Sequence, residues 1–195
     1  MQAAGGSRLI LVRHGESEGN RDRTFTRNPE VPLTAQGEAQ ARAAAARIAE
    51  AYAPARLIAS PNTRARQTAE IIAARFRLSV EIEAALREQS FGSYAGRPYD
   101  ALFEDDTYHT TPRTHWRPPG GESLLEVYAR VVPAFERIAR SNPDDDIVIV
   151  SHGGVMLALC AYASGSWEDI TVTPNAGVVV IECRDGGCTP PVALA

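Results

Sequence analysis

Two of the four histidines in the chain stand where a short apolar run gives way to a glycine. His14 comes two residues after the run at 8–12, and His152 comes two residues after the run at 146–150. An imidazole can act as a nucleophile, transfer a proton or, when protonated, bind an anion. A single histidine at a strand end often only caps backbone groups, but two in matching positions favour a shared chemical role.

Two arginines accompany these histidines. Arg13 directly precedes His14, and Arg64 falls in the first turn of a predicted helix at 64–76. A positive charge at a helix start opposes the helix dipole, so an arginine suits this position when a bound anion offsets the repulsion. Arg66 lies on another side of the same helix, and we expect it to be solvated. The pattern therefore predicts an anion site built from arginine and histidine.

Strands and helices alternate along the chain, which predicts an α/β fold with a mostly parallel central sheet and helices on both faces. In such a three-layer domain, functional sites gather at the carboxyl ends of the strands, where both histidines are placed. Periodicity predicts strands at 8–12, 55–59, 78–82, 146–150 and 177–183, and helices at 36–52, 64–76, 123–140 and 154–162.

The length of 195 residues fits one domain. Residues 1–7 are predicted to form a disordered lead and residues 8–195 the domain. Thr34 is a good N-cap for the first long helix, and Pro54 ends that helix. Residues 88–121 are rich in Pro, Gly, Arg and aromatic side chains and show no clear period. We expect them to form a loop-rich excursion over the site that includes one short helix.

Composition and charge exclude several classes of function. The net charge of −4 argues against attraction to nucleic acid or to an anionic membrane, so local cations must attract an anionic substrate. No apolar stretch approaches the length of a membrane span. The three cysteines are odd in number and lack paired metal-ligand spacing, which predicts free thiols and a reducing compartment, the cytoplasm.

The order of these motifs resembles that of the histidine phosphatase superfamily, in its phosphoglycerate-mutase-like branch. The match runs from about residue 8 to about residue 183. The residues that carry it are Arg13-His14-Gly15-Glu16-Ser17, Asn20, the turn from Leu33-Thr34 to Gly37, Ser60-Pro61 with Arg64 to Ala69, Leu86 with Glu88 and Gly92, Gly120-Gly121-Glu122-Ser123, and Ser151-His152-Gly153.

The resemblance implies that His14 is a nucleophile that attacks phosphorus as neutral imidazole and forms a phosphohistidine, with its other ring nitrogen held by a backbone carbonyl. Arg13 and Arg64 can then clamp phosphate oxygens bidentately, and a protonated His152 adds a third cation. Further substrate contacts are expected from the Asn20 amide, from Thr26 and from the Gly153 N–H at a helix start.

Glu88 matches the general acid of that family. It is expected to protonate the departing alkoxide and then to deprotonate the water that hydrolyses the phosphohistidine. A nearby phosphate dianion favours the protonated carboxylic acid that the first step requires. The alternative for this residue is a solvated surface glutamate.

A phosphatase that hydrolyses small phosphate monoesters is the function we predict. The glycolytic mutases of this family carry Glu-Arg-His-Tyr-Gly followed by clustered basic residues, whereas this chain has Glu-Gln-Ser-Phe-Gly at 88–92 and scattered arginines in the excursion. A cofactor-dependent phosphoglycerate mutase is the alternative, and a catalytically silent phospho-ligand binding protein is a further one. Arg27 could contact a second anionic group or close the pocket against large ones, and the sequence does not decide between these roles.

Other hydrolase classes fit less well. A metallohydrolase would need further ligands at suitable spacing beside the two histidines, and a serine hydrolase would need a Gly-x-Ser-x-Gly turn. We therefore predict no metal and no cofactor. The expected partner is a small phosphorylated metabolite, with neither nucleic acid nor membrane, and the sequence gives no prediction of the oligomeric state.

Several residues near these motifs have local interpretations. Glu16 and Ser17 could bond within their loop or contact substrate, and Trp116 and Tyr94 could line a pocket or pack the excursion. His109 and His115 are expected at the surface. The run of aspartates at 144–146 is expected to be a solvated loop rather than a cation site.

Overall fold

The computed structural model describes residues 6–141, 144–184 and 187–195. Its centre is a seven-stranded sheet in the order β3-β2-β4-β1-β5-β6, with β7 also paired to β5. The strands are β1 (Gly6–Arg13), β2 (Arg56–Ala59), β3 (Val80–Ile82), β4 (Asp146–Ser151), β5 (Val178–Arg184), β6 (Gly187–Cys188) and β7 (Val192–Leu194).

Four neighbouring strands, β3, β2, β4 and β1, run parallel, which confirms the mostly parallel sheet. The strand predicted at 177–183 is present as β5, but it pairs antiparallel with β1. The chain then turns back twice, because β6 and β7 both pair antiparallel with β5. These last two strands have only two and three residues, too short to show a period in the sequence.

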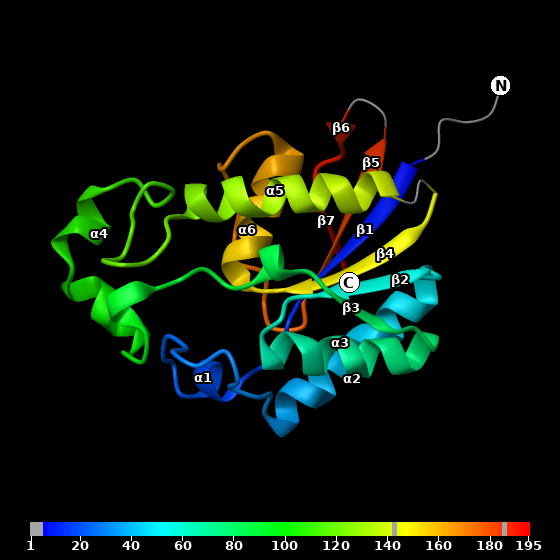
Figure 1. Cartoon of the computed structure of the whole chain (residues 1–195), viewed down its shortest axis with the longest axis horizontal. Coiled ribbons are helices and arrows are strands. Elements are labelled where there is room, and N and C mark those ends of the chain that lie inside the picture. Colours follow the sequence, from blue (N-terminus) through cyan, green and yellow to red (C-terminus); the bar gives the residue numbers. More distant parts are fainter. Residues whose placement is uncertain (1–5, 142–143, 185–186) are drawn as a thin grey trace.

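Helices cover both faces of the sheet (Figure 1). On one face lie α2 (Ala35–Ala51) and α3 (Thr63–Phe76), and on the other lie α5 (Leu124–Ser141) and α6 (Gly153–Ser164). Alternate residues of β1 pack against the helices on opposite faces of the sheet, because successive strand side chains point to opposite faces. Leu9 and Leu11 belong to the core cluster with α5 and α6, and Ile10 belongs to the cluster with α2 and α3. The predicted three-layer domain is therefore confirmed.

The segment after β1 is fixed against the start of α2. Thr34 caps this helix, and its hydroxyl accepts a hydrogen bond from the Gly37 N–H at 3.0 Å, as predicted. A Cβ on Gly37 would collide with the Glu16 backbone, and a Cβ on Gly15 would collide with that of Gly37. The two glycines thus let the backbone that follows His14 lie directly on the helix start.

Two expectations about the chain need correction. The strand β1 begins at Gly6, and Ser7 is buried with its hydroxyl on the Ala139 carbonyl at 2.7 Å, so the disordered lead predicted for 1–7 does not include these two residues. Residues 1–5 lie outside the described part of the chain. Asp146 is not solvated, because it opens the central strand β4 and is buried there, accepting hydrogen bonds from Arg8 and from the Ala53 N–H.

The cysteines also differ from expectation. Cys183 and Cys188 face each other across the β5–β6 pair and form a disulfide, so the prediction of three free thiols is wrong for two of them. Cys160 is free and buried, and burial raises the pKa of its thiol to about 11. The argument from free thiols to a reducing compartment loses its basis. No helix in the described ranges is long and apolar enough to cross a membrane.

The excursion at 88–121 projects from one end of the sheet, on the left in Figure 1. It contains two 3-10 helices, Gly92–Tyr94 and Tyr99–Glu104, and one short helix, α4 (Asp106–Thr110). A small cluster of its own, including Tyr94 and Trp116, packs its interior. The loop-rich excursion with a single short α-helix is thus as predicted.

Candidate active site

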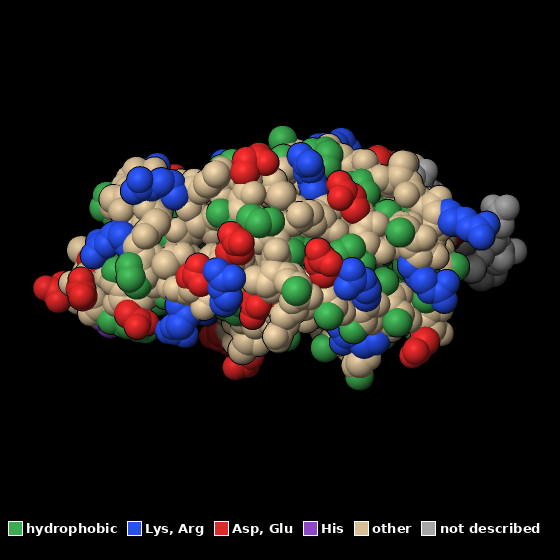
Figure 2. All heavy atoms as spheres, turned by 90° about the horizontal axis from the view of Figure 1, so that it is seen from below, with side chains coloured by type: hydrophobic (Ala, Val, Ile, Leu, Met, Phe, Trp, Pro, Cys, Tyr) green, Lys and Arg blue, Asp and Glu red, His purple; other side chains and the backbone are tan. Residues whose placement is uncertain are grey.

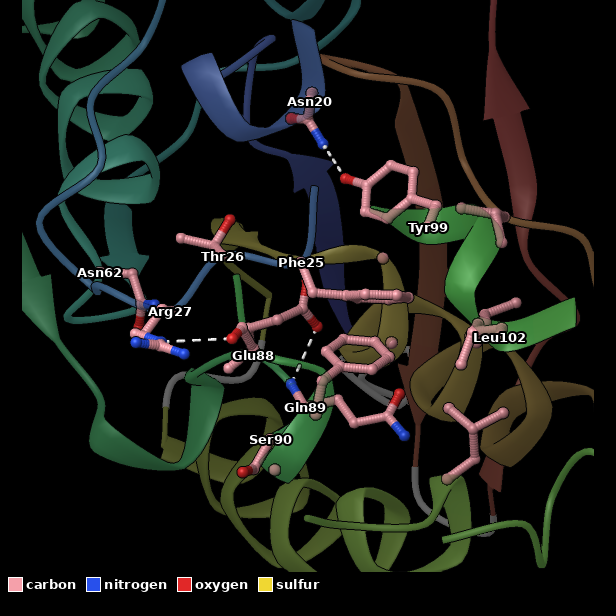
Figure 3. Close-up of a pocket in the computed structure, with 18 of the residues that line it drawn as sticks. Asn20, Phe25, Thr26, Arg27, Asn62, Glu88, Gln89, Ser90, Tyr99 and Leu102 are labelled. Atoms are coloured by element: carbon pink, nitrogen blue, oxygen red, sulfur yellow. Dashed lines mark hydrogen bonds between the residues drawn. The ribbon is translucent and has the colours of Figure 1, made fainter. Parts of the chain in front are cut away.

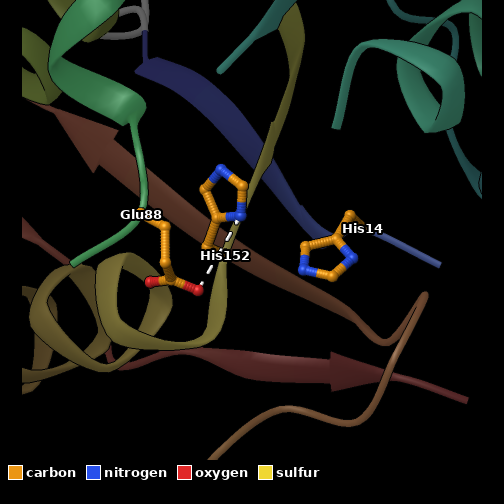
Figure 4. Close-up of side chains that lie close together, drawn as sticks. All are labelled: His14, Glu88 and His152. Carbon is orange, nitrogen blue, oxygen red and sulfur yellow. Dashed lines mark ion pairs between the residues drawn. The ribbon is translucent and has the colours of Figure 1, made fainter. Parts of the chain in front are cut away.

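The two strand-end histidines meet because their strands are parallel neighbours. In the register of β1 with β4, Arg13 lies opposite Ser151, which places His14 beside His152. The ring centroids are 5.2 Å apart, and both rings are buried. Glu88, the first residue of the excursion, reaches the same place (Figure 4).

The ring of His14 has a defined tautomer. Its Nδ1 lies 2.6 Å from the Gly15 carbonyl oxygen and donates to it, which identifies the backbone carbonyl expected from the family resemblance. Its Nε2 therefore carries the lone pair, and it accepts a hydrogen bond from Arg64 Nε at 3.1 Å. Thr68 fixes the Gly15 peptide, because its hydroxyl accepts the Gly15 N–H at 3.0 Å. The atom available for attack is Nε2.

Burial and charge keep both rings neutral. The pKa of His14 and that of His152 lie well below the usual histidine value, first because of burial and then because of the Arg64 charge. Neutral imidazole is what a nucleophilic His14 requires. The 3.8 Å approach of His152 Nδ1 to Glu88 Oε2 thus joins a neutral ring to a carboxyl group, and the cationic role expected for His152 requires a bound dianion.

Three buried nitrogens around His14 have no hydrogen-bond partner within the described part of the chain: Arg13 Nε, Arg64 Nη1 and His152 Nδ1. An unsatisfied buried polar group costs about 1–3 kcal/mol. Two of the three are guanidinium N–H donors. The third is a donor in the tautomer in which Ser60 gives its hydroxyl proton to His152 Nε2, 2.7 Å away, rather than to Asn62 Oδ1, 3.3 Å away. The set is therefore complementary to an oxyanion.

The fold holds both arginines in place. Arg13 donates from Nη1 to the Thr173 carbonyl at 2.8 Å, which leaves Nε for a ligand. Arg64 is in the first turn of α3 and only 3% exposed, whereas Arg66, two residues later, is exposed as predicted. A buried cation at the positive end of a helix dipole favours an anion in the same place.

Asn20, Thr26 and Gly153 line the same cavity as His14, Arg13 and Arg64. The Asn20 Oδ1 accepts from Ser17 N–H at 3.2 Å and from Asn175 Nδ2 at 3.1 Å, so its amide N–H groups point the other way, where one donates to the Tyr99 hydroxyl (Figure 3).

Asn175 is a residue that the sequence did not single out. Besides orienting Asn20, its amide donates to the His14 carbonyl at 3.1 Å. Glu16 accepts from the hydroxyl of Thr34, the N-cap of α2, at 2.7 Å, and Ser17 caps α1 (Glu18–Arg21). His109 and His115 are exposed, as expected.

Glu88 lies at the cavity wall, with its side chain 21% exposed and Oε1 accepting the Gln89 N–H at 2.9 Å. Its segment is tied to α5 through Glu122, which accepts two hydrogen bonds from Arg87 at 2.7 Å each. Arg130 bonds the same carboxylate and donates to the Arg87 carbonyl at 3.1 Å.

Burial acts to raise the pKa of Glu122, but the hydrogen bonds from Arg87 and Arg130 outweigh it and lower that pKa to about 2. In the sequence, Glu122 is marked only as part of a Gly-Gly-Glu-Ser motif, which does not reveal its role. Its structural task is to hold the backbone that carries Glu88.

The cavity measures about 610 Å³. Arg13, His14 and Arg64 form one part of its wall. Residues of the excursion, among them Gln89, Tyr99 and Leu102, form another part (Figure 3). Arg27 lies at its margin, exposed, with Nε donating to the Ala95 carbonyl at 3.2 Å. Trp116 both lines the cavity and packs the excursion, whereas Tyr94 only packs.

His14, Glu88 and His152 could in principle share a metal ion, since one ligand atom of each lies within 4.8 Å of the others. The surroundings favour an anion instead. Arg64 already donates to His14 Nε2, and the charges of Arg13 and Arg64 act on both rings. A divalent cation here would face two buried guanidinium groups.

A three-layer α/β fold with paired histidines and arginines at the strand ends defines a class of phosphate-handling enzymes that act through histidine. The sequence profile of the histidine phosphatase superfamily (branch 1) matches residues 9–192, and the chain belongs to this family.

Named relatives include both mutases and phosphatases. Phosphoglycerate mutase-like protein 4 of Arabidopsis thaliana is 33% identical over 184 residues, covering 91% of this chain and 80% of that protein. The uncharacterized phosphatase PhoE of Bacillus subtilis is 28% identical, over 85% of this chain and 81% of that one. The mycobacterial glucosyl-3-phosphoglycerate phosphatase complexed with VO3 superposes with a TM-score of 0.82 at 26% identity, covering 99% and 98% of the two chains.

Proposed function

We propose that the protein is a phosphatase that hydrolyses phosphate monoesters through a phosphohistidine on His14, with Glu88 as general acid and base. The observation that carries this proposal is the set of three unsatisfied nitrogens of Arg13, Arg64 and His152 beside a neutral His14. Preorganised donors of this kind stabilise the charge on a transferring phosphoryl group.

In the first step, the phosphate oxygens accept hydrogen bonds from the two arginines and from His152. Arg64 Nε then turns from His14 to an oxygen, which frees the Nε2 lone pair. Nε2 forms a bond to phosphorus as the ester P–O bond breaks. The electron pair leaves with the alcohol oxygen, which takes a proton from Glu88.

In the second step, the carboxylate of Glu88 takes a proton from water. The resulting hydroxide character lets the water oxygen bond to phosphorus while the P–N bond to His14 breaks. Inorganic phosphate leaves, His14 is again neutral, and Glu88 again holds its proton. Each step therefore moves one proton through the same carboxyl group.

A phosphoglycerate mutase is the second candidate, since several relatives carry that name and Arg27 stands at the cavity margin. A mutase must hold a second anionic group and exclude water. Two other arginines at the cavity are already paired, Arg23 with Asp100 at 3.1 Å and Arg87 with Glu122 at 2.7 Å. Arg113 also lines the cavity and pairs with no carboxylate among the described residues, so hydrolysis is preferred over mutase action because of the run Glu-Gln-Ser-Phe-Gly at 88–92. The presence of Glu88 with both histidines argues against a silent binding protein.

The test is a panel of phosphate monoesters assayed for phosphate release, with conversion of 3- to 2-phosphoglycerate measured alongside. We expect release from several monoesters and little isomer conversion. Rapid isomer conversion with slow release would establish the mutase. Binding of phosphate without either reaction would establish the silent protein.

The proposed substrate is a small phosphorylated metabolite rather than nucleic acid or a membrane. The face seen in Figure 2 carries charges of both signs scattered over it, without one broad basic area, in line with the net charge of −4. The cytoplasm remains the predicted location, without the support that three free thiols would have given.

Phosphate release is expected to need no added metal ion, because Arg13, Arg64 and the histidines supply the positive charge that Mg²⁺ supplies in other phosphoryl-transfer enzymes. After exhaustive treatment with a chelator, kcat and KM should stay within about twofold of their starting values. Restoration of activity only by a divalent ion would assign the His14, Glu88 and His152 group to a metal.

Arg64→Lys is expected to lower kcat/KM about 10–100-fold, although the charge is kept. Arg64 uses Nε toward His14 and presents Nη1 to the ligand, and a lysine has one nitrogen for both tasks. The matched control is Arg66→Lys, on the exposed side of the same helix, which should change kcat/KM less than twofold. Equal effects of the two substitutions would remove Arg64 from the site.

A further inference from the structure

The part of the cavity beyond the phosphate-binding groups has an apolar wall. Phe25 contributes to it from the segment after α1, and the excursion supplies most of the rest. The side chains that form this wall, called the apolar wall below, are Phe25, Phe91, Leu102, Phe103, Tyr108 and Trp116.

The rings of the apolar wall support one another. The centroids of Phe25 and Phe91 are 4.3 Å apart, and those of Tyr108 and Trp116 are 5.0 Å apart. Tyr99 adds an edge-on contact to Phe25 at 4.9 Å, and its hydroxyl is bonded to Asn20. Rings packed in this way form a preformed surface rather than a flexible one.

Apolar surface is also exposed at the mouth of this cavity. Among the described residues, five large hydrophobic side chains are exposed, and two of them line the cavity: Phe103 at 64% and Val172 at 46%. Phe103 belongs to the excursion, and Val172 lies beside Gly153, so exposed apolar surface is present on two sides of the cavity.

The cavity is also larger than a three-carbon acid phosphate needs. Cavities of roughly 300–1,000 Å³ enclose ligands of drug size, and this one measures about 610 Å³. A phosphoglycerate bound at His14 would leave the apolar wall uncovered. Of the other arginines that line the cavity, Arg23 is paired with Asp100 at 3.1 Å.

We propose that the preferred substrate is a phosphate monoester of a large apolar alcohol, whose hydrocarbon part lies on the apolar wall while the phosphate lies at His14. This inference rests on the proposed function, because the phosphate group anchors the ligand. The apolar wall then binds the hydrocarbon part equally in the substrate and in the transition state. Such binding lowers KM more than it raises kcat, and it sets the preference among substrates.

The test uses ethyl, butyl, hexyl and octyl phosphate below their micelle concentrations. Their leaving alcohols differ little in acidity, so the chemical step is nearly constant along the series. We expect kcat/KM to rise about two- to fourfold per methylene, which over the six methylenes from ethyl to octyl phosphate amounts to about 60-fold or more. The matching alkylphosphonates, which have no ester bond to break, should bind with affinities graded in the same order.

Phe103→Ser should reduce the preference for octyl over ethyl phosphate about fivefold, because octyl phosphate loses more contact with the apolar wall than ethyl phosphate does. The matched control is Val192→Ser on β7, a side chain equally exposed at 65% but outside this cavity, which should leave the preference unchanged.

Hydrolysis and phosphonate binding that do not vary with chain length would overturn the inference and leave the phosphatase intact. Equal loss of preference in both serine variants would also overturn it. Graded phosphonate binding without hydrolysis of any ester would support the apolar wall and overturn the phosphatase.

Discussion

His14→Ala should abolish both turnover and formation of the phosphoenzyme, with a loss of about 10⁴-fold or more in kcat, as expected when a covalent nucleophile is removed. The reason is the geometry of Nε2, which carries the lone pair because Nδ1 is committed to the Gly15 carbonyl. Rapid quenching with a ³²P-labelled monoester measures the result. The wild type should give an acid-labile, base-stable phosphoprotein, and the variant should give none.

The matched control for this prediction is His109→Ala, because His109 is exposed on α4 and does not line the cavity. It should label and turn over like the wild type. Since His14 is buried, folding of the His14 variant is checked by its thermal unfolding and by phosphate binding, which the arginines should retain in part. Phosphoenzyme in a folded His14→Ala protein would mean that another residue is the nucleophile.

The placement of the strand-end groups could be predicted because it depends on local patterns. The apolar run before His14 indicates a buried strand, and a parallel neighbour brings His152 to the same edge. The place of Arg64 at the anion site could be predicted because the residue falls in the first turn of α3. None of these inferences needed knowledge of contacts between distant segments.

The supporting contacts could not be predicted, because they join residues far apart in the chain. Asn175 bonds His14 and Asn20 across 161 and 155 positions, and nothing in its local sequence marks it. The disulfide between Cys183 and Cys188 was missed for a different reason: the five-residue spacing becomes a pair only once β6 folds back on β5.

Glu88→Gln should affect substrates according to their leaving groups. The carboxyl group lies on the cavity wall close to both histidines, where it can reach the oxygen that leaves from phosphorus. Glutamine keeps the carbonyl that accepts the Gln89 N–H, so the local backbone should be preserved. It cannot donate and then accept the proton that the two steps exchange. The substitution thus separates proton transfer from anion binding.

With an alkyl phosphate, the alkoxide is a poor leaving group, and the loss in kcat/KM should approach the roughly 10²–10⁴-fold expected for general acid–base catalysis. With an aryl phosphate, the phenolate needs little protonation, and phosphorylation of His14 should remain measurable. Hydrolysis of the phosphohistidine should slow for both substrates, so phosphoenzyme should accumulate with the aryl ester.

The control for Glu88→Gln is Asp100→Asn, since Asp100 is an acidic residue that lines the same cavity but pairs with Arg23 at 3.1 Å. It should change aryl and alkyl hydrolysis alike and only modestly. If Glu88→Gln also slowed both substrates equally and trapped no phosphoenzyme, Glu88 would not be the general acid. A selective loss of alkyl hydrolysis in the Asp100 variant would then transfer that role to Asp100. Glu104 and Asp105, the acidic residues of the excursion that the sequence offers as alternatives, do not line the cavity, and Asp105 instead accepts from the Tyr94 hydroxyl at 2.6 Å.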